Sequence, residues 1–400
     1  MRFPEFHGEW EKCKVSDLLD FYSTNSLSWD QLEYRTDNLL NLHYGLIHVG
    51  LPTMVDLSKD ILPAIKKGNE PKNFEFCKEG DIAFADASED TNEVAKAIEF
   101  YTLEDKAVVC GLHTIHGRDK SNKTVVGYKG YAFSSTAFHH QIRRIAQGTK
   151  IYSISAKNFD ECYIGIPSKE EQTKIAKLLR LIDERIATQS KLIEKLESLI
   201  KGINQRVFMN SGNNYKLGEI CEIRSGYSGS QLLSKKGLKV SRIETISGHK
   251  VNMERVGYVA PFESSENYRL RVGDILFSNI NSVEYIGNTA FIDKDYDLYH
   301  GMNLLRLTPN HIVVIPFYLY LLLNTNRMLN RFKAVCNKAV SQASINQTEL
   351  GKTVVQIPPI NTQEQICELY QALYTKLETE SHTKSLFQNQ KQYMLRQMFI

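Results

Sequence analysis

The stretch that decides the fold is residues 166–208, IPSKEEQTKIAKLLRLIDERIATQSKLIEKLESLIKGINQRVF. Pro167 suits a helix entry, and Glu170 and Glu171 follow where the helix dipole favours negative charge. Two mostly apolar rows then recur every seven positions: Ile175, Ile182, Gln189, Leu196 and Ile203, and, four residues on, Leu179, Ile186, Ile193, Ile200 and Val207. Two interleaved rows of this kind predict a coiled-coil helix. At 1.5 Å per residue it is about 60 Å long, more than one small domain can bury.

A second copy of this stretch is residues 357–399, IPPINTQEQICELYQALYTKLETESHTKSLFQNQKQYMLRQMF. A shift of 191 residues, from Pro167 to Pro358, carries both rows across without a gap. The flanks repeat as well, because Gly80-Asp81-Ile82 recurs as Gly273-Asp274-Ile275 and residues 15–18 recur as 217–220. The chain is therefore a tandem duplication of a globular domain followed by a helix.

This duplication predicts an α/β (α+β) fold with two mixed domains. We expect the two long helices to pair as an antiparallel coiled coil, with a pseudo-twofold relation between the copies. The predicted parts are a first globular domain at 1–165, a first long helix at 166–208, a second globular domain at 209–357 and a second long helix at 358–400.

Local patterns predict the main elements inside each domain. Alternation of apolar and polar residues predicts strands at 41–49, 128–133 and 239–246, and each Gly-Asp-Ile turn should open a strand. A short helix is expected around 138–146. A period near 3.6 predicts one helix over 315–332.

The composition predicts a soluble cytoplasmic protein. Residues 1–5 contain no apolar run, so we expect no secretory signal. The most apolar stretch, 312–323, is too short to span a bilayer and contains Pro316. Seven cysteines without a CxxC pair are typical of reduced thiols in a cytoplasm.

Charge is unevenly distributed along the chain. Residues 1–165 contain 19 Lys and Arg against 24 Asp and Glu, whereas residues 209–357 contain 17 against 12. Within the first copy, residues 118–157 contain eight basic residues and a single acid, Asp119. This pattern predicts a one-sided face for a polyanion. The alternative is that the two halves of the domain interleave and their charges cancel.

The motifs that suggest catalysis or cofactor binding are incomplete in this sequence. Gly351-Lys352-Thr353 resembles the end of a P-loop, but Asn346 stands where the first glycine is needed. Cys110, His113 and His116, with His139 and His140, could suggest zinc, but paired ligand spacing is missing and the second copy lacks the cluster. No S-adenosylmethionine-binding glycine loop is recognisable. We therefore predict a binding protein that is not an enzyme, with no cofactor and no metal.

Two divergent α/β domains, each followed by a heptad helix, resemble the specificity subunit of Type I restriction–modification systems. The resemblance rests on Ile166-Pro167 with Glu171-Gln172-Thr173-Lys174-Ile175, on Ile357-Pro358-Pro359 with Gln363-Glu364-Gln365-Ile366, on the two Gly-Asp-Ile turns and on Leu217-Gly218-Glu219-Ile220. It implies that each domain reads one half of a bipartite site in double-stranded DNA. It also implies that the helices set the spacing and dock two methyltransferase subunits, with restriction and translocase subunits completing the complex.

Basic side chains would neutralise phosphates in such a complex, and amides would read base edges. The candidate DNA-binding residues are Arg143, Arg144, Gln147, Lys150, Lys157, Arg224, Arg242, Asn279, Asn281, Arg331, Lys333 and Lys338. We expect the acidic residues of 70–105 to face away from this surface. After the Gly-Asp-Ile turns, the segment 278–282 (SNINS) should approach DNA, and its acidic counterpart 86–90 (DASED) should not.

Two other interpretations remain open. The chain could be a coiled-coil scaffold whose globular domains bind proteins, and salt-dependent DNA affinity would separate this interpretation from DNA recognition. It could also be a stand-alone methyltransferase or nuclease, although the missing motifs argue against an enzyme.

Overall fold

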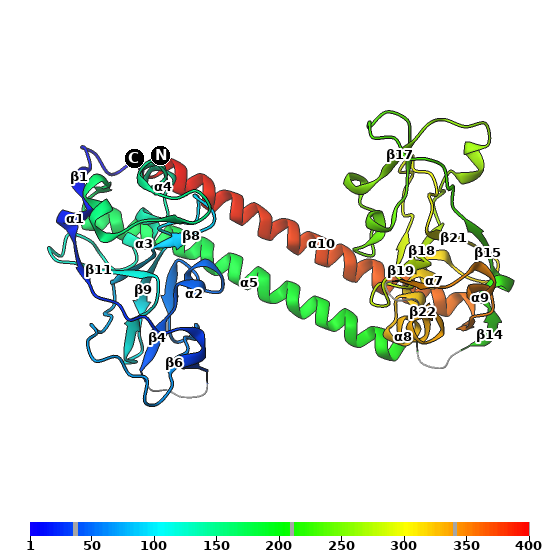
Figure 1. Ribbon diagram of the computed structural model, residues 1–400, viewed down its shortest axis with the longest axis horizontal. Helices are drawn as coiled ribbons and strands as arrows, with labels where there is room; N and C mark the ends of the chain where they lie inside the picture. The colour runs from blue at the N-terminus through cyan, green and yellow to red at the C-terminus, as the bar shows by residue number, and fades with distance from the viewer. Residues whose placement is uncertain (35–38, 209–211, 339–341, 400) are drawn as a thin grey trace. The chain divides into compact units, whose positions relative to one another are not determined.

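The computed structural model describes residues 1–34, 39–208, 212–338 and 342–399. The chain divides into two compact units, Met1–Lys191 with Ser381–Ile400, and Leu192–Glu380. Each unit contains an α/β domain and part of both long helices, α5 (Lys169–Val207) and α10 (Ile360–Gln397) (Figure 1). The predicted two-domain α/β fold is thus confirmed. The predicted boundaries at 209 and 400 lie outside the described residues. No described helix is both long and apolar enough to cross a membrane.

The first domain is built on two sheets. The larger sheet has the order β2 (Leu19–Tyr22), β11 (Thr114–Asp119), β7 (Ile82–Ala85), β9 (Ala97–Thr102) and β5 (Met54–Asp56). The smaller has the order β10 (Val108–Cys110), β4 (Leu40–Leu42), β6 (Ala64–Ile65) and β3 (Leu32–Glu33). Two ribbons join β1 (Glu11–Lys14) to β13 (Tyr163–Ile166) and β8 (Ala87–Ser88) to β12 (Tyr152–Ser153).

The second domain repeats four strands of the larger sheet in the same order, and this shared sheet is called the central sheet below. Its strands are β15 (Cys221–Ser225), β21 (Leu304–Pro309), β18 (Ile275–Ser278) and β20 (Thr289–Phe291). Smaller pairings involve β14 (Asn213–Lys216) with β24 (Val354–Ile357), β16 (Leu238–Val240) with β17 (Gly257–Val259), and β19 (Ile280–Asn281), β23 (Ala343–Ser344) and β22 (Asn337–Lys338). The strands that correspond between the copies are therefore β2 and β15, β11 and β21, β7 and β18, and β9 and β20.

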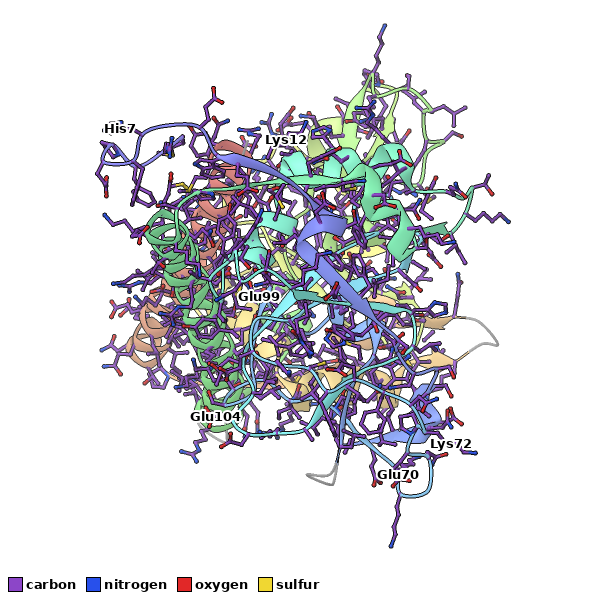
Figure 2. All side chains as sticks on the ribbon, turned by 90° about the vertical axis from the view of Figure 1, so that its left-hand side faces the viewer. His7, Lys12, Glu70, Lys72, Glu99 and Glu104 are labelled. Carbon is purple, nitrogen blue, oxygen red and sulfur yellow. The ribbon has the colours of Figure 1, made fainter. Side chains whose placement is uncertain are left out.

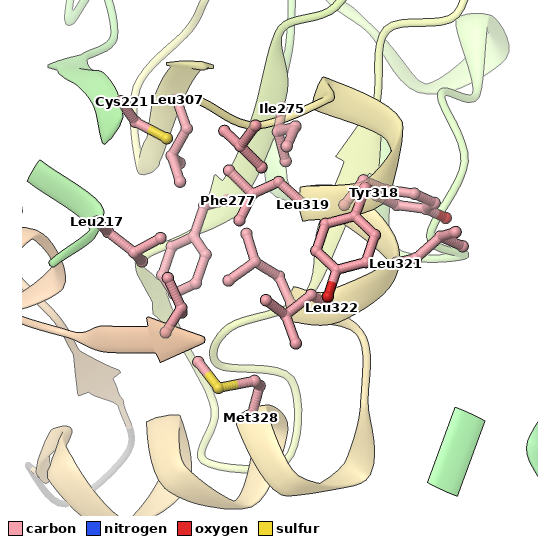
Figure 3. Close-up of a cluster of buried hydrophobic side chains, with 14 of the residues drawn as sticks. Leu217, Cys221, Ile275, Phe277, Leu307, Tyr318, Leu319, Leu321, Leu322 and Met328 are labelled. Carbon is pink, nitrogen blue, oxygen red and sulfur yellow. The ribbon is translucent and has the colours of Figure 1, made fainter. Parts of the chain in front are cut away.

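Short helices complete each domain. The first contains α1 (Val15–Leu18), α2 (Tyr44–His48), α3 (Lys129–Phe133), α4 (Thr136–Ile145) and the 3₁₀ turns η1 (Trp29–Gln31) and η2 (Ala156–Glu161). The second contains α6 (Leu217–Ile220), α7 (Pro316–Leu323), α8 (Asn326–Val335), α9 (Gln347–Gly351), η3 (Ile243–Ile246), η4 (Met253–Arg255) and η5 (Ser265–Tyr268). Apolar α7 fills the second core, where Leu319 lies against the sheet residues Ile275 and Phe277 (Figure 3).

Four local predictions are corrected by these elements. The stretch 41–49 is strand only to Leu42 and then helix α2, whose Gly45 amide is capped by the His43 ring at 3.1 Å. The stretch 239–246 is strand only to Val240, before η3. The predicted helix 315–332 is two helices, because Thr325 ends the run and caps α8.

The fourth correction is that 128–133 is not a strand but contains helix α3. Its reason is a fully buried carboxylate. Glu99 on β9 accepts hydrogen bonds from the amides of Gly127 and Gly130, both at 2.8 Å, and so satisfies the helix start. Figure 2 shows Glu99 inside the first domain, whereas the exposed Lys72 points outward. Burial raises the pKa of Glu99, and Lys129 at 3.4 Å opposes that rise.

The repeated Gly-Asp-Ile turns open β7 and β18 as predicted. Gly80 and Gly273 have φ of +85° and +98°, a conformation that favours glycine. Each aspartate closes its own turn, since Asp81 Oδ2 accepts from the Lys78 amide at 2.8 Å and Asp274 Oδ2 from the Arg271 amide at 2.9 Å. The motif is therefore structural.

A buried glutamine fixes each domain to the start of its long helix. Gln172 Nε2 donates to the carbonyls of Pro167 (2.9 Å) and Lys123 (3.0 Å), and its Oε1 accepts from the Val125 amide at 2.9 Å. Gln363, 191 residues later, makes the matching bonds, to the carbonyls of Pro358 (2.8 Å) and Val313 (3.1 Å) and from the Ile315 amide at 2.8 Å. Neither side chain is exposed to solvent. The shared Gln-x-x-Ile motif thus marks this joint.

Within each unit, the local parts of α5 and α10 pack together. In the first unit, Ile175 and Leu179 share a core with Leu395 and Phe399, and Lys391 Nζ lies 2.7 Å from Asp183 Oδ1. There the N-terminal amine also donates to the Gln397 carbonyl.

The second unit contains the corresponding contacts. Ile200 and Phe208 share a core with Ile366 and Tyr370, and the Tyr370 hydroxyl donates to Asn204 Oδ1.

Candidate nucleic-acid interface

The end of helix α4 presents basic side chains in the first domain. Ser135 caps the helix start, and Phe138 and Ile142 face the core. Arg143 and Arg144 are exposed in the last turn, where positive charge complements the helix dipole.

A polar ribbon lies next to this helix end. Gln147 and Ser153 exchange two backbone hydrogen bonds, at 3.1 and 2.8 Å, and β12 then pairs with β8. Arg143 donates to Asn92 Oδ1 at 2.9 Å, so α4 also meets the segment after β8. The structure therefore brings Arg143 and Gln147 to one edge of the domain. Gln147, Lys150 and Lys157 are all exposed.

That the acidic residues of 70–105 face away from the DNA surface stays a prediction, although the segment 86–90 lies beside the polar ribbon. Strand β8 lies within this segment and pairs directly with β12. Asp86 is half-buried and contacts the ring Nδ1 of His113 at 3.1 Å. Burial raises the pKa of Asp86, and His113 opposes the rise. The Asp86 carboxylate thus has a partner within the domain, whereas Glu89 and Asp90 are exposed.

The second domain presents α8 and a three-stranded ribbon in the same places. Asn281 on β19 and Lys338 on β22 both pair with Ala343 of the central strand β23, so they lie on its two sides. Lys338 is exposed and Lys333 is half-buried. This ribbon is the counterpart of the β8–β12 ribbon, because the amides of Ile345 and Ile154 donate to the carbonyls of Asn279 and Asp86, both at 2.9 Å.

The two asparagines of segment 278–282 differ in their environments. Asn281 Nδ2 donates to Ser278 Oγ at 3.1 Å, and its Oδ1 accepts from the Ser282 amide at 2.8 Å. Asn279 Oδ1 is buried and has no hydrogen-bond partner in the described parts of the chain. Asn281 keeps one amide proton available for another acceptor.

Three predicted arginines have partners inside the domain. Arg331 donates to the Val354 carbonyl at 2.6 Å, much as Gln141 on α4 donates to the Tyr163 carbonyl at 2.9 Å. Arg331 thus joins α8 to β24 in the same way that Gln141 joins α4 to β13. This equivalence escapes sequence reasoning because the side chains are unlike.

The other two are Arg224 and Arg242, which lie on β15 and directly before η3. Arg224 donates from Nε to Glu222 at 2.7 Å, and Arg242 Nε lies 3.4 Å from Glu244. Both are exposed, and their neighbouring acids reduce the local positive potential.

The fold defines a class of protein, a tandem repeat of two α/β domains that are each joined to a long helix. The family model described as Type I restriction modification DNA specificity domain matches residues 58–198 and 211–386. The chain belongs to this family, which confirms the resemblance noted from the sequence.

Individual relatives carry the same description. The putative Type I restriction enzyme MjaX specificity subunit of Methanocaldococcus jannaschii is 38% identical over 188 residues, 46% of this chain and 44% of that protein. The Type I restriction enzyme EcoKI specificity subunit of Escherichia coli is 24% identical over 279 residues, 63% of this chain and 59% of that protein. The chain thus spans about half the length of the curated relatives it matches.

Solved structures share the fold. The S subunit of a Type I restriction–modification system from M. genitalium superposes with a TM-score of 0.60 at 16% identity, over 100% of this chain and 99% of that one. A chain from a study of complex assembly and conformational transition in the type I R-M system gives a TM-score of 0.62 at 16% identity, over 98% and 97%.

Proposed function

We propose that this chain is the DNA specificity subunit of a Type I restriction–modification complex and is not itself catalytic. Each α/β domain would read one half of a bipartite site in double-stranded DNA. The observation that carries the proposal is the match of the DNA specificity family to both halves of the chain. The repeated pairing of a basic helix end with a polar ribbon supports it.

In this proposal the four predicted parts have separate tasks. Residues 1–165 and 209–357 recognise DNA, and the helices at 166–208 and 358–400 pair as an antiparallel coiled coil that sets the distance between the half-sites. Two half-sites one helical turn apart would be about 34–36 Å from centre to centre. The helices also dock two methyltransferase subunits, and restriction and translocase subunits join the full complex.

The candidate residues fall into three groups. Arg143, Arg144, Lys150, Lys157 and Lys338 are exposed cations suited to phosphates. Gln147, Asn279 and Asn281 carry amides suited to base edges. Arg224, Arg242, Arg331 and Lys333 would add positive potential, since the three arginines already have partners within the domain.

Charge reversal at the end of α4 tests the residues that are proposed to bind DNA phosphates. Arg143→Glu with Arg144→Glu should weaken binding of the methyltransferase complex to every DNA sequence. The slope of log affinity against log salt should fall by about one for each phosphate that the protein no longer neutralises. Lys67→Glu with Lys72→Glu makes the same charge change at exposed positions outside segment 118–157 and is the matched control. If both double variants weaken DNA binding equally, the effect comes from the net charge of the domain and not from direct contacts between α4 and phosphates.

The base-reading group is tested by sequencing methylated sites. Asn279→Ala with Asn281→Ala should relax or abolish one half of the recognised site and spare the other half. The control is Ser88→Ala, at the ribbon position of the first domain that corresponds to Asn281. It should leave the half of the site that the first domain reads unchanged. Full bipartite specificity in the double asparagine variant would exclude segment 278–282 as a reader. A chain whose DNA affinity is independent of salt would favour the scaffold interpretation.

A further inference from the structure

Two thiols and an imidazole meet in the interior of the first domain. Cys77 precedes the Gly80 turn, Cys110 ends β10, and His116 lies in β11. One ligand atom from each lies within 4.8 Å of the other two. Their exposed fractions are 6%, 2% and 0%. We propose that Cys77, Cys110 and His116 form a binding site for Zn²⁺.

The separation of the two sulfur atoms fits a shared metal. Cys77 Sγ and Cys110 Sγ are 3.6 Å apart. A disulfide requires about 2.05 Å. Two thiolates bound tetrahedrally to one zinc ion at about 2.3 Å are about 3.8 Å apart. The pair is therefore placed as two ligands of one ion would be.

The imidazole of His116 is oriented from behind by a carboxylate. His116 Nε2 lies 2.7 Å from Asp81 Oδ2, and Arg118 holds the same carboxylate through two bonds of 2.8 Å. Binding of a metal requires the neutral ring, and when the Nε2 proton is donated to Asp81 the lone pair of that ring is on Nδ1. Nδ1 is buried and has no hydrogen-bond partner among the residues that the structure describes. Metal-bound histidines typically have a carboxylate on the other nitrogen in this way.

The second domain shows the same positions without the ligand set. The Leu270 amide donates to the Leu298 carbonyl at 2.9 Å, as the Cys77 amide donates to Val108 at 2.8 Å. By strand register Arg306 stands where the first copy has His116. Arg306 donates to the carbonyls of Arg269 and Asn267, at 3.1 and 3.2 Å. The second copy thus has a guanidinium at this position that donates to two backbone carbonyls through its terminal nitrogens, although its buried Nε has no partner among the described residues. The first copy has two thiols and an imidazole there instead.

The site would join two parts of the first domain. Cys110 belongs to the small sheet through β10, whereas His116 belongs to the central sheet through β11. A metal ion bound to both residues would cross-link the smaller sheet of the first domain to its central sheet, which the second domain repeats. Thiolate and imidazole together favour Zn²⁺ over Mg²⁺ or Ca²⁺, which prefer oxygen.

Metal analysis of the reduced full-length chain tests the site. After incubation with Zn²⁺ and exhaustive dialysis, we expect about one zinc per chain. Cys77→Ser, Cys110→Ser and His116→Asn should each lose at least nine-tenths of it. Cys162→Ser, which alters another buried thiol of the same domain, should keep it. Co²⁺ in place of zinc should give sulfur-to-metal charge-transfer absorption.

A second measurement covers variants that fail to fold. All three thiols are buried, so the readout is a change in alkylation rate: in the unaltered chain, removing Zn²⁺ with a chelator should speed the alkylation of Cys77 and Cys110, whereas the rate at Cys162 should stay the same. The inference is overturned if the folded, reduced chain retains less than a tenth of a zinc. A Cys77–Cys110 disulfide in the natively purified chain would also overturn it.

Discussion

The buried glutamine at the start of α10 allows a sharp test of how a domain is fixed to its helix. Gln363→Ala removes three hydrogen bonds and leaves the Ile315 amide and the Val313 carbonyl buried without their partner. Each such group costs about 1–3 kcal/mol. We therefore expect the second unit to lose about 3–5 kcal/mol of its free energy of unfolding, a large part of an ordinary domain's stability.

Hydrogen exchange read by mass spectrometry measures each unit separately. Amides of β18 and β21 should lose protection in Gln363→Ala, whereas those of β7 and β11 in the first unit should not. Gln172→Ala should give the reverse pattern, because it makes the matching bonds in the first unit.

Two further variants separate the causes. Gln363→Met keeps most of the side-chain volume and should be nearly as unstable as the alanine variant, since the hydrogen bonds are lost in both. Gln365→Ala changes an exposed glutamine on the same turn and should stay within about 0.5 kcal/mol. A loss below about 1 kcal/mol in Gln363→Ala would refute the view that this glutamine holds the joint.

Two other predictions concern buried titratable groups. Glu99→Gln leaves one helix-start amide unpaired and removes the charge facing Lys129, so the first unit should lose about 3 kcal/mol, measured by urea unfolding with the fluorescence of Trp10 and Trp29; an unchanged midpoint would contradict this. Burial lowers the pKa of His300 to about 4, below its ordinary 6.5, so the second unit should be fully stabilised above pH 6.5 and lose about 3 kcal/mol as the pH falls to 4. His300→Asn should flatten that loss in hydrogen exchange, and an equal loss in the variant would exclude His300 as its source.

Local, periodic signals allowed much of the framework to be predicted. The heptad rows of residues 166–208 predicted a helix that the structure places at Lys169–Val207. Each Gly-Asp-Ile turn predicted the strand that follows it, since the glycine conformation and the aspartate cap involve only a few neighbouring residues. The duplication was recognisable for the same reason.

Features that depend on distant residues were missed. Residues 128–133 look like a strand, and they contain a helix because Glu99, about thirty residues earlier, caps its start. Two of the three proposed zinc ligands, Cys110 and His116, were considered from the sequence and set aside, because the third, Cys77, lies far from them in the chain and no paired spacing marks the set. Among the candidate DNA-binding residues, Arg331 has a carbonyl partner that only the folded chain supplies. Pairings of this kind leave no period in a sequence.

The two copies also show that one joint can be built from different chemistry. In the first domain the central sheet meets the next helix through the carboxylate of Glu99 and the amide of Gly130. The second domain has Phe291 and Tyr320 at this junction, with ring centroids 5.8 Å apart. In contrast, the glutamine that begins each long helix keeps the same three kinds of partner in both copies. Because those bonds go to backbone groups, the side chains around them are free to change. The two domains of this chain therefore differ in their sheets and ribbons, where recognition is proposed to lie, and keep the same attachment to the long helix.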